Sequence, residues 1–315
     1  MTLPVTPAAI QTAYERIRSH VRRTPLMRAD AIAGADVTFK LELTQHAGSF
    51  KTRGAFNNLL SRTAPAAGVA AASGGNHGIA TALAAHRLGL KATIFVPEIS
   101  SPVKIAAIRA QGAEVVVGGA RYADAQEACD RFAAASGALT IHPYDAVETL
   151  EGQGTVALEW EQDQAQLGLG ALDTVLVAVG GGGLAAGMAA YWRGRVKVVA
   201  VEPEGSRCLH AAFEAGEPVD VPVYSVAADS LGARRVGALP FAIAREAIDH
   251  VALVGDAAIR DAQKRLWADY RLASEPGGAA ALAALLSGAY APRPGERVGV
   301  LLCGGNVDPA SLAAL

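Results

Sequence analysis

The sequence predicts an α/β protein built on parallel sheets. Short strand-like apolar runs alternate with alanine-rich amphipathic segments, which is the pattern of successive βαβ units. Two of these runs lead through glycine-rich loops into a helix, as happens at the carboxyl ends of parallel strands. The chain has 315 residues and is 51% hydrophobic, so it can bury a large core and form two domains.

The first third of the chain shows the alternation clearly. Residues 37–43 alternate apolar and polar side chains and predict a half-buried strand. Residues 48–55 form a turn that leads into a helix ending near Leu60. The next βαβ unit is expected as a strand at 69–72, a loop at 73–78, a helix at 79–88 and a strand at 92–96.

The same plan continues along the remaining chain. We expect helices at 103–111, 122–135, 184–193, 257–272 and 278–286, and strands at 114–117, 138–142, 173–179, 196–202 and 298–302.

The composition excludes several classes of protein. A formal net charge of -2 lacks the basic surplus of a nucleic-acid binder. The most apolar stretch, residues 175–190, is interrupted by four glycines and is too short to span a bilayer. The N-terminus shows no secretory signal, and three distant cysteines indicate reduced thiols. We therefore expect a cytoplasmic protein without nucleic-acid or membrane partners.

Four consecutive glycines, residues 180–183, lie between a predicted strand and a helix. Unhindered N–H groups at a helix N-terminus attract phosphate. NAD fits the loop, because Gly180-x-Gly182-x-x-Ala185 matches a relaxed dinucleotide fingerprint and Glu202 ends the next strand. Another phosphate ligand fits as well, and so does a merely tight turn.

Two further features carry chemical groups. The loop Ser73-Gly-Gly-Asn-His-Gly78 offers donors for an oxyanion or carboxylate, although capping of the next helix also explains Ser73 or Asn76. Lys51 is one of only six lysines and stands at the beginning of a predicted helix. A lone lysine is usually a solvated side chain, so its context decides its interpretation.

That context resembles the pyridoxal-phosphate-dependent serine/threonine dehydratases and the related serine racemases. Lys51 lies in a stretch, residues 40–55, that is similar to the family's cofactor-attachment region. The motifs that carry the resemblance extend over nearly the whole chain: Arg23-Thr-Pro-Leu26, Ser73–Gly78, His142-Pro-Tyr-Asp145 with Gly152-Gln-Gly-Thr155, Gly180–Gly183, and Cys303-Gly-Gly-Asn306. The resemblance implies fold type II, with a large domain of residues 1–63 and 146–315 and a small inserted domain of residues 64–145.

The resemblance also implies a role for each matching residue. Lys51 would hold pyridoxal 5'-phosphate covalently and then remove the α-proton of the substrate, which requires an uncharged amine. The other assignments are Phe50 against the pyridine ring, Asn76 on the phenolic oxygen, Gly180, Gly181, Gly182 and Gly183 on the phosphate, Ser73, Asn76 and His77 around the substrate carboxylate, and Asp229 in the substrate pocket. Cys303 would face the pyridine nitrogen, where a thiol gives a weaker electron sink than a carboxylate and favours β-elimination.

Two departures from the family pattern are informative. Serine racemases have a second serine after the one that matches Ser73, and it supplies the proton donor on the opposite face; this chain has Gly74 instead. Some relatives bind a divalent ion through a Glu-Pro glutamate and two further positions. Glu202 and Ser206 match that pattern, but Cys208 stands where an aspartate is usual, which disfavours magnesium or calcium.

The resemblance, with these departures, implies an L-serine or L-threonine ammonia-lyase, and it also implies a homodimer. Because the chain ends at Leu315, we expect no regulatory domain and a catabolic enzyme. The alternatives of the same fold are a racemase and a 3-hydroxyaspartate dehydratase, for which Arg234 and Arg235 could bind a second carboxylate. An NAD-binding oxidoreductase and a non-catalytic cofactor-binding protein are the alternatives of other classes.

Overall fold

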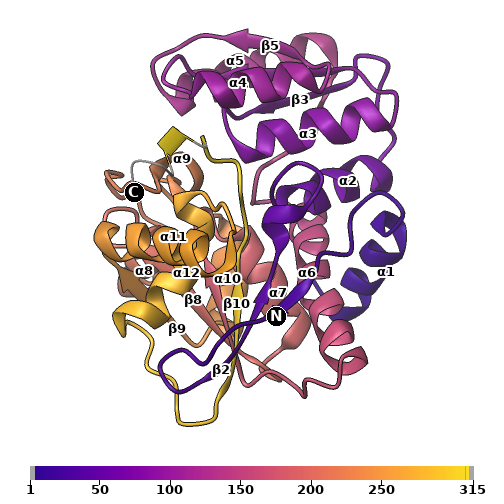
Figure 1. The fold of residues 1–315 in the computed structure, drawn as a ribbon. Coiled ribbons are helices and arrows are strands. Elements are labelled where there is room, and N and C mark those ends of the chain that lie inside the picture. The colour runs from indigo at the N-terminus through magenta and orange to yellow at the C-terminus, as the bar shows by residue number, and fades with distance from the viewer. Residues whose placement is uncertain (1–3, 309, 312–315) are drawn as a thin grey trace.

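The computed structural model describes residues 4–308 and 310–311. It contains two sheets with helices packed on them: a large lobe around a six-stranded sheet and a small lobe around a four-stranded sheet (Figure 1). Residues 1–3 and Leu315, on which the arguments about a leader and about the end of the chain depend, lie outside this part. No helix among the described residues is both long and apolar enough to cross a bilayer.

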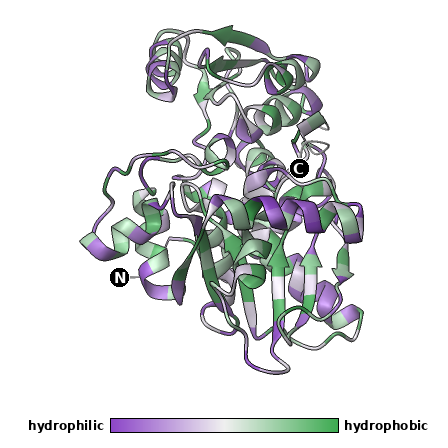
Figure 2. Ribbon diagram, turned by 60° about the vertical axis from the view of Figure 1, so that its left-hand side comes forward, coloured by the Kyte–Doolittle hydropathy of each residue, from purple (hydrophilic) through white to green (hydrophobic). Residues whose placement is uncertain are grey.

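The large sheet combines the two ends of the chain. Its strands lie in the order β1 (Leu26–Arg28), β2 (Asp36–Lys40), β10 (Arg297–Leu301), β7 (Thr174–Ala178), β8 (Lys197–Pro203) and β9 (His250–Val254). β1 pairs with β2 in the antiparallel direction, and the other neighbours pair in parallel, with Val300 opposite both Phe39 and Leu176. The sheet is buried, and its strands are strongly hydrophobic (Figure 2).

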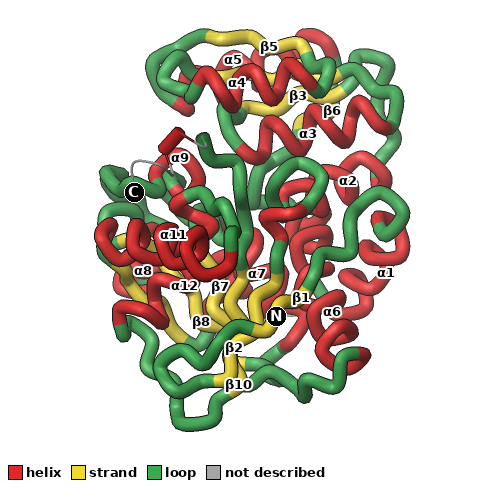
Figure 3. The backbone as a smooth tube through the Cα atoms, in the orientation of Figure 1, coloured by secondary structure: helices red, strands yellow, loops and turns green. Residues whose placement is uncertain are grey.

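The order of the strands explains where the helices lie. The chain runs from β7 to β8 and β9 in one direction and then returns to β10, and parallel crossovers are right-handed. The helices of the two directions therefore cover opposite faces. α7 (Gly183–Trp192) packs beside α6 (Val147–Gln166), whereas α11 (Asp256–Tyr270) packs beside α12 (Pro276–Ser287) (Figure 3).

The small lobe is formed by the middle of the sequence. Its strands are all parallel and lie in the order β5 (Glu114–Val117), β4 (Ala92–Val96), β3 (Val69–Ala72) and β6 (Leu139–Thr140). α2 (Lys51–Ser61), α3 (Asn76–Arg87) and α4 (Pro102–Ala110) share one apolar core with this sheet, and α5 (Tyr122–Ser136) shares a second core. The chain passes between the lobes at residues 62–68 and 141–146.

Several predicted elements differ from the observed ones. The strand expected at 37–43 ends at Lys40, because the 3-10 helix η1 (Glu42–Thr44) turns the chain so that Glu42 is buried against Arg53. The strand expected at 138–142 is only two residues long. The sequence interpretation also lacked several elements: α1 (Pro7–Ile17), β1, α6, α8 (Cys208–Ala215), α9 (Ala228–Leu231), α10 (Ala238–Ala247) and β9.

Two glycines in α6 explain both why the sequence did not predict this helix and how the helix packs. Glycine weakens a helix by about 1 kcal/mol relative to alanine, so Gly152 and Gly154 argue against a helix. In the structure, a Cβ on Gly152 would lie 2.7 Å from Cα of Gly54 in α2. A Cβ on Gly154 would lie 2.8 Å from the carbonyl oxygen of Gly187 in α7. The glycines therefore allow α6 to approach both neighbouring helices closely.

A buried ionic cluster fixes α2 on α6. The guanidinium of Arg53 donates to both carboxylate oxygens of Glu42, at 2.9 and 2.6 Å, and to both oxygens of Glu159, at 3.1 and 2.9 Å. Lys40 also donates to Glu159, at 2.7 Å. All four side chains are at most 1% exposed. Because Arg53 lies two residues after Lys51, the cluster holds the start of α2 in place.

Candidate active site

Lys51 is the first residue of α2, and its amine points to the connection between the lobes. Its Nζ donates to the backbone carbonyl of Pro143 at 2.7 Å and lies 5.2 Å from the centre of the Phe50 ring. Burial lowers the pKa of Lys51 to about 8. About a tenth of the amine is therefore uncharged at pH 7, far more than for an ordinary lysine, and the uncharged amine is the state a nucleophile or base requires.

Cys303 lies beside this lysine, and its expected place opposite the pyridine nitrogen of the cofactor stays a prediction. Phe50 N–H donates to the carbonyl of Cys303 at 3.1 Å, and Ser49 forms a β-bridge with Gly304. Burial raises the pKa of the Cys303 thiol, so the thiol stays neutral. The structure therefore brings Cys303 into one site with Phe50 and Lys51, although Cys303 follows Lys51 by 252 residues in the sequence.

The loop after β3 forms the second side of the site. Ser73 Oγ accepts the N–H of Gly75 at 3.2 Å, and α3 begins at Asn76, three residues earlier than expected. Asn76 is 9% exposed and contacts Glu275 and Asn306 through its amide. Its side chain therefore belongs to the buried lining of the site rather than to a surface cap.

His77 is buried and neutral. Burial lowers its pKa to about 3, with a further contribution from Lys51. Its Nε2 lies 2.9 Å from the carbonyl oxygen of Ile141, and because a neutral ring must donate to a carbonyl, we place the hydrogen on Nε2. The expected contact between His77 and a substrate carboxylate stays a prediction. The Nε2–H cannot be the donor in that contact, because it already donates to Ile141.

The tetraglycine segment lies at the carboxyl end of β7 and begins α7. Gly182 has a φ of 92°, which is readily adopted only by glycine, and a Cβ on Gly181 would overlap the ring of Tyr144. Within the described residues, the N–H groups of Gly181, Gly182 and Gly183 donate to no backbone carbonyl. This row of free donors at a helix N-terminus suits a phosphate group.

Lys51 and the glycine loop both contact the segment that returns the chain from the small lobe to the large one. Lys51 is bound to Pro143, and the next residue, Tyr144, packs on Gly181. α9 completes the arrangement between the loops: the carbonyl oxygen of Asp229 faces Gly75, and Cα of Leu231 would lie 3.2 Å from a Cβ on Gly180. The helix α9 is therefore next to both glycine-containing loops, with Asp229 on the side of Gly75 and Leu231 on the side of Gly180.

Three functional candidates were missed by the sequence interpretation. Lys104 Nζ lies 2.8 and 2.9 Å from the carboxylate oxygens of Asp229 and 3.3 Å from Oε2 of Glu275. Asn306 was quoted only as part of a motif. The segment Glu275-Pro-Gly-Gly278 opens a helix and could have indicated Glu275, but no local signal indicated Lys104.

The residues suggested for a metal ion make other contacts. Both carboxylate oxygens of Glu202 accept backbone N–H groups, from Leu209 at 2.9 Å and His210 at 2.8 Å. The hydroxyl of Ser206 donates to the carbonyl of Leu231 at 2.6 Å, a contact that leaves open the backbone carbonyl of Ser206, which is the atom that the family pattern uses. In the described part of the chain, no group of three or more His, Cys, Asp or Glu side chains could hold a metal ion. The metal assignment stays a prediction without support from this geometry.

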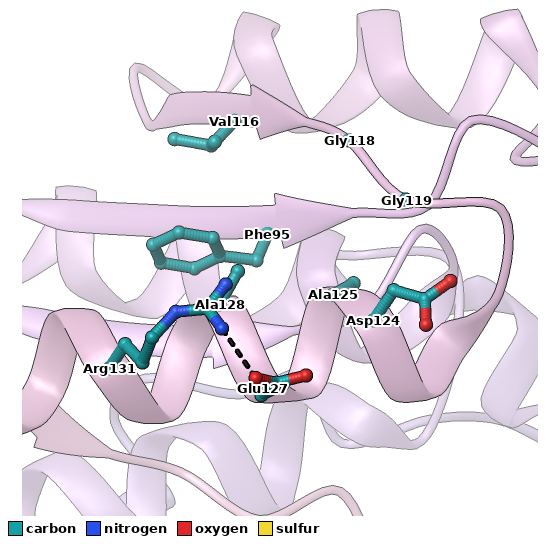
Figure 4. Close-up of a pocket in the computed structure, with 9 residues that line it drawn as sticks. All are labelled: Phe95, Val116, Gly118, Gly119, Asp124, Ala125, Glu127, Ala128 and Arg131. Atoms are coloured by element: carbon teal, nitrogen blue, oxygen red, sulfur yellow. Dashed lines mark hydrogen bonds and ion pairs between the residues drawn. The ribbon is translucent and has the colours of Figure 1, made fainter.

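A hollow elsewhere in the small lobe contains none of the predicted site residues. Its volume is about 280 Å³, and it lies between α5 and the ends of β4 and β5 (Figure 4). Arg131 and Glu127 form an ion pair along its rim. This ion pair is exposed and joins two residues of one helix. We therefore keep the site around Lys51, and not this hollow, as the candidate active site.

The chain is similar to several known proteins. The family model "pyridoxal-phosphate dependent enzyme" matches residues 17–304. A phenylserine dehydratase from Ralstonia pickettii is 39% identical, covering 97% of this chain and 94% of that protein. An L-threonine ammonia-lyase from Geobacter sulfurreducens is 37% identical, covering 97% and 77%. A solved serine racemase from maize has a TM-score of 0.91 at 32% identity, covering 99% and 96%.

The chain therefore belongs to the pyridoxal-phosphate-dependent enzymes, of fold type II. Within that family it is related to the threonine dehydratases and serine racemases, and its cofactor is pyridoxal phosphate. The residues present fit this cofactor, because a half-buried amine with a lowered pKa and a glycine loop with free N–H groups lie together. Pyridoxal phosphate therefore replaces NAD as the expected ligand of residues 180–183.

Proposed function

We propose that this enzyme is an ammonia-lyase that converts L-serine or L-threonine into a 2-oxo acid and ammonia. The observation that carries the proposal is the asymmetry of the site: Lys51 offers an amine, whereas position 74 of the facing loop is a glycine without a proton to give. Racemisation needs a proton donor on each face of the substrate carbon, but β-elimination needs only one base.

The side chains of this enzyme have separable tasks. The bound cofactor withdraws electrons from the α-carbon of the substrate. Lys51 would take the α-proton, and the β-hydroxyl would take up one proton and leave as water. The two protons balance when Lys51 later gives up the one that it took. The released enamine then hydrolyses to the 2-oxo acid and ammonia. We assign Asn76 to the phenolic oxygen of the cofactor, Cys303 to its pyridine nitrogen, Phe50 to one ring face, and Ser73 and His77 to the substrate loop, with Asp229 at the pocket.

The space around Gly74 supports elimination over racemisation. A Cβ on Gly74 would overlap Oγ of Ser100 and lie 2.5 Å from its Cβ. It would also lie 3.0 Å from Cγ1 of Val96, which is completely buried. Because Ser100 fills the space and buried Val96 limits any shift of the loop, a side chain at position 74 does not fit while Ser100 keeps its present place.

A substrate panel tests the proposal. The purified holoenzyme is incubated with L-serine, L-threonine, D-serine, 3-hydroxyaspartate and phenylserine, with and without a chelator, and both 2-oxo acid and D-amino acid are measured. We expect 2-oxo acid and ammonia in equal amounts from L-serine or L-threonine. Abundant D-serine with little pyruvate from L-serine would contradict the proposal, and no turnover of any substrate would support a non-catalytic protein.

The geometry does not favour 3-hydroxyaspartate. Arg234 and Arg235 are both exposed, and Nε of Arg235 already pairs with Asp220 at 2.6 Å. The cation beside Asp229 is instead Lys104, which is neutralised by two carboxylates. Among these three described cations only Arg234 pairs with no carboxylate, and its side chain is exposed.

We also propose the organisation of the whole molecule. The domain boundaries at residues 64 and 145 are supported by their position in the two connections between the lobes. A homodimer and a cytoplasmic location follow from the resemblance and the reduced thiols. Sedimentation of the holoenzyme and fractionation of the producing cells test these two statements.

A further inference from the structure

Asn76 is held from two sides by polar side chains. Its Nδ2 donates to Oε1 of Glu275, and its Oδ1 accepts from Nδ2 of Asn306 at 2.9 Å. Burial raises the pKa of Glu275, but Lys104 beside its second carboxylate oxygen favours the ionised form. An ionised carboxylate has no hydrogen to donate, so the amide nitrogen of Asn76 then faces Glu275. Asn306 is fixed in turn, because its Nδ2 also donates to the carbonyl of Ala47 at 2.8 Å. The amide of Asn76 therefore has one orientation and retains one uncommitted N–H hydrogen.

Glu275 is itself firmly placed. It is 2% exposed, directly precedes α12, and has Lys104 at 3.3 Å from its second carboxylate oxygen. A Cβ on Gly304 would overlap Oε1 of Glu275 and lie 3.3 Å from Nδ2 of Asn76. Glycine at position 304 is thus what allows Glu275 and Asn76 to meet, directly after Cys303.

We propose that Glu275 is a positioning residue for the cofactor, which turns the Asn76 amide so that a free N–H faces the phenolic oxygen of pyridoxal phosphate. The inference rests on the assignment of Asn76 to that oxygen. A donor at this place stabilises negative charge on the phenolic oxygen. It therefore lowers the pH at which the visible absorption band of the lysine-bound cofactor changes.

Three variants of the holoenzyme test the inference by pH titration of that band. Glu275→Met removes the acceptor but keeps the length of the side chain, so the Asn76 amide can turn over. We expect the titration midpoint to rise by about one pH unit, as for one lost hydrogen bond to a charged group. Glu275→Gln is the matched control, because its amide oxygen still accepts from Asn76; its midpoint should stay within about 0.3 units of the wild type. Asn76→Ala gives the full effect of losing the donor.

The outcomes separate the inference from the assignment on which it rests. An unchanged midpoint in Glu275→Met beside a raised midpoint in Asn76→Ala overturns the role of Glu275 alone. Unchanged midpoints in both variants overturn the assignment of Asn76 and the inference with it. Equal shifts in Glu275→Met and Glu275→Gln assign the effect to the charge of Glu275 and also overturn the inference.

A second variant protects the test against misfolding. Thermal unfolding reports whether Glu275→Met is folded. If it is not, Glu275→Ala also removes the acceptor of the Asn76 amide, and we expect its midpoint to rise in the same direction. A folded Glu275→Ala protein with the wild-type midpoint would contradict the inference.

Discussion

The side-chain nitrogen of Lys51 lies 2.7 Å from the carbonyl oxygen of Pro143. This contact joins the start of α2 to the segment that returns the chain from the small lobe to the large one. The next residue of that segment, Tyr144, covers the glycine loop that would hold the cofactor phosphate. The reactive amine and the phosphate loop are therefore positioned by the same two residues.

Replacing Lys51 by alanine should abolish covalent attachment of the cofactor. We expect turnover to fall by about a thousandfold or more, because both the nucleophile and the base are lost. Borohydride reduction followed by peptide mass mapping should label Lys51 in the wild type and no residue in the variant. Lys91→Ala, which changes an exposed lysine, is the control and should keep both label and activity. Label on another lysine of the wild-type protein would refute the assignment.

The lowered pKa of Lys51 predicts how cofactor uptake depends on pH. Only the uncharged amine attacks an aldehyde, so the rate at which apoprotein binds pyridoxal phosphate should rise by about tenfold per pH unit below the pKa. With a pKa of about 8, the rate should level off above pH 8. Stopped-flow absorbance at several pH values measures this. A rate that still rises steeply up to pH 10 would show an amine with the ordinary lysine pKa.

A serine at position 74 should be tolerated without a large loss of stability only when Ser100 is replaced by a smaller residue. Gly74→Ser alone places its Cβ against Ser100 and should destabilise the enzyme by about 1–3 kcal/mol. The double variant Gly74→Ser with Ser100→Gly removes that overlap and should recover most of the stability. By its resemblance to the racemases, the double variant should also form D-serine from L-serine. Chemical denaturation and a chiral amino-acid assay measure the two effects, and Ser100→Gly alone is the control. Equal stability of the single and double variants would contradict the steric argument.

The buried cluster around Arg53 should contribute strongly to stability. Arg53→Met leaves Glu42 and Glu159 with too few partners and should lower the free energy of unfolding by about 3–5 kcal/mol. Arg131→Ala breaks an exposed ion pair with Glu127 and should cost at most about 1 kcal/mol. Urea denaturation followed by tryptophan fluorescence compares the two. A similar small loss in both variants would show that the cluster does not hold α2 in place.

Much of the fold could be predicted from local patterns. The strands at 69–72, 92–96 and 114–117 have the predicted bounds, because short apolar runs between turn residues have a buried parallel sheet as their simplest solution. Glycines limited the prediction in α6, where they serve close packing against α2 and α7 rather than a turn. The short strand β6 and the turn at Glu42 depend on neighbours far away in the sequence.

The sequence by itself determined the α/β class, the cofactor family and the residues that match its motifs, because each of these is carried by residue types in a local order. Only the tertiary structure decided that Lys104 and Glu275 belong to the site, that Ser100 fills the space beside Gly74, and that the Asn76 amide has one orientation. These relations join residues between 26 and 230 positions apart. Burial and hydrogen bonding between distant segments leave no signal in the local pattern of a single chain.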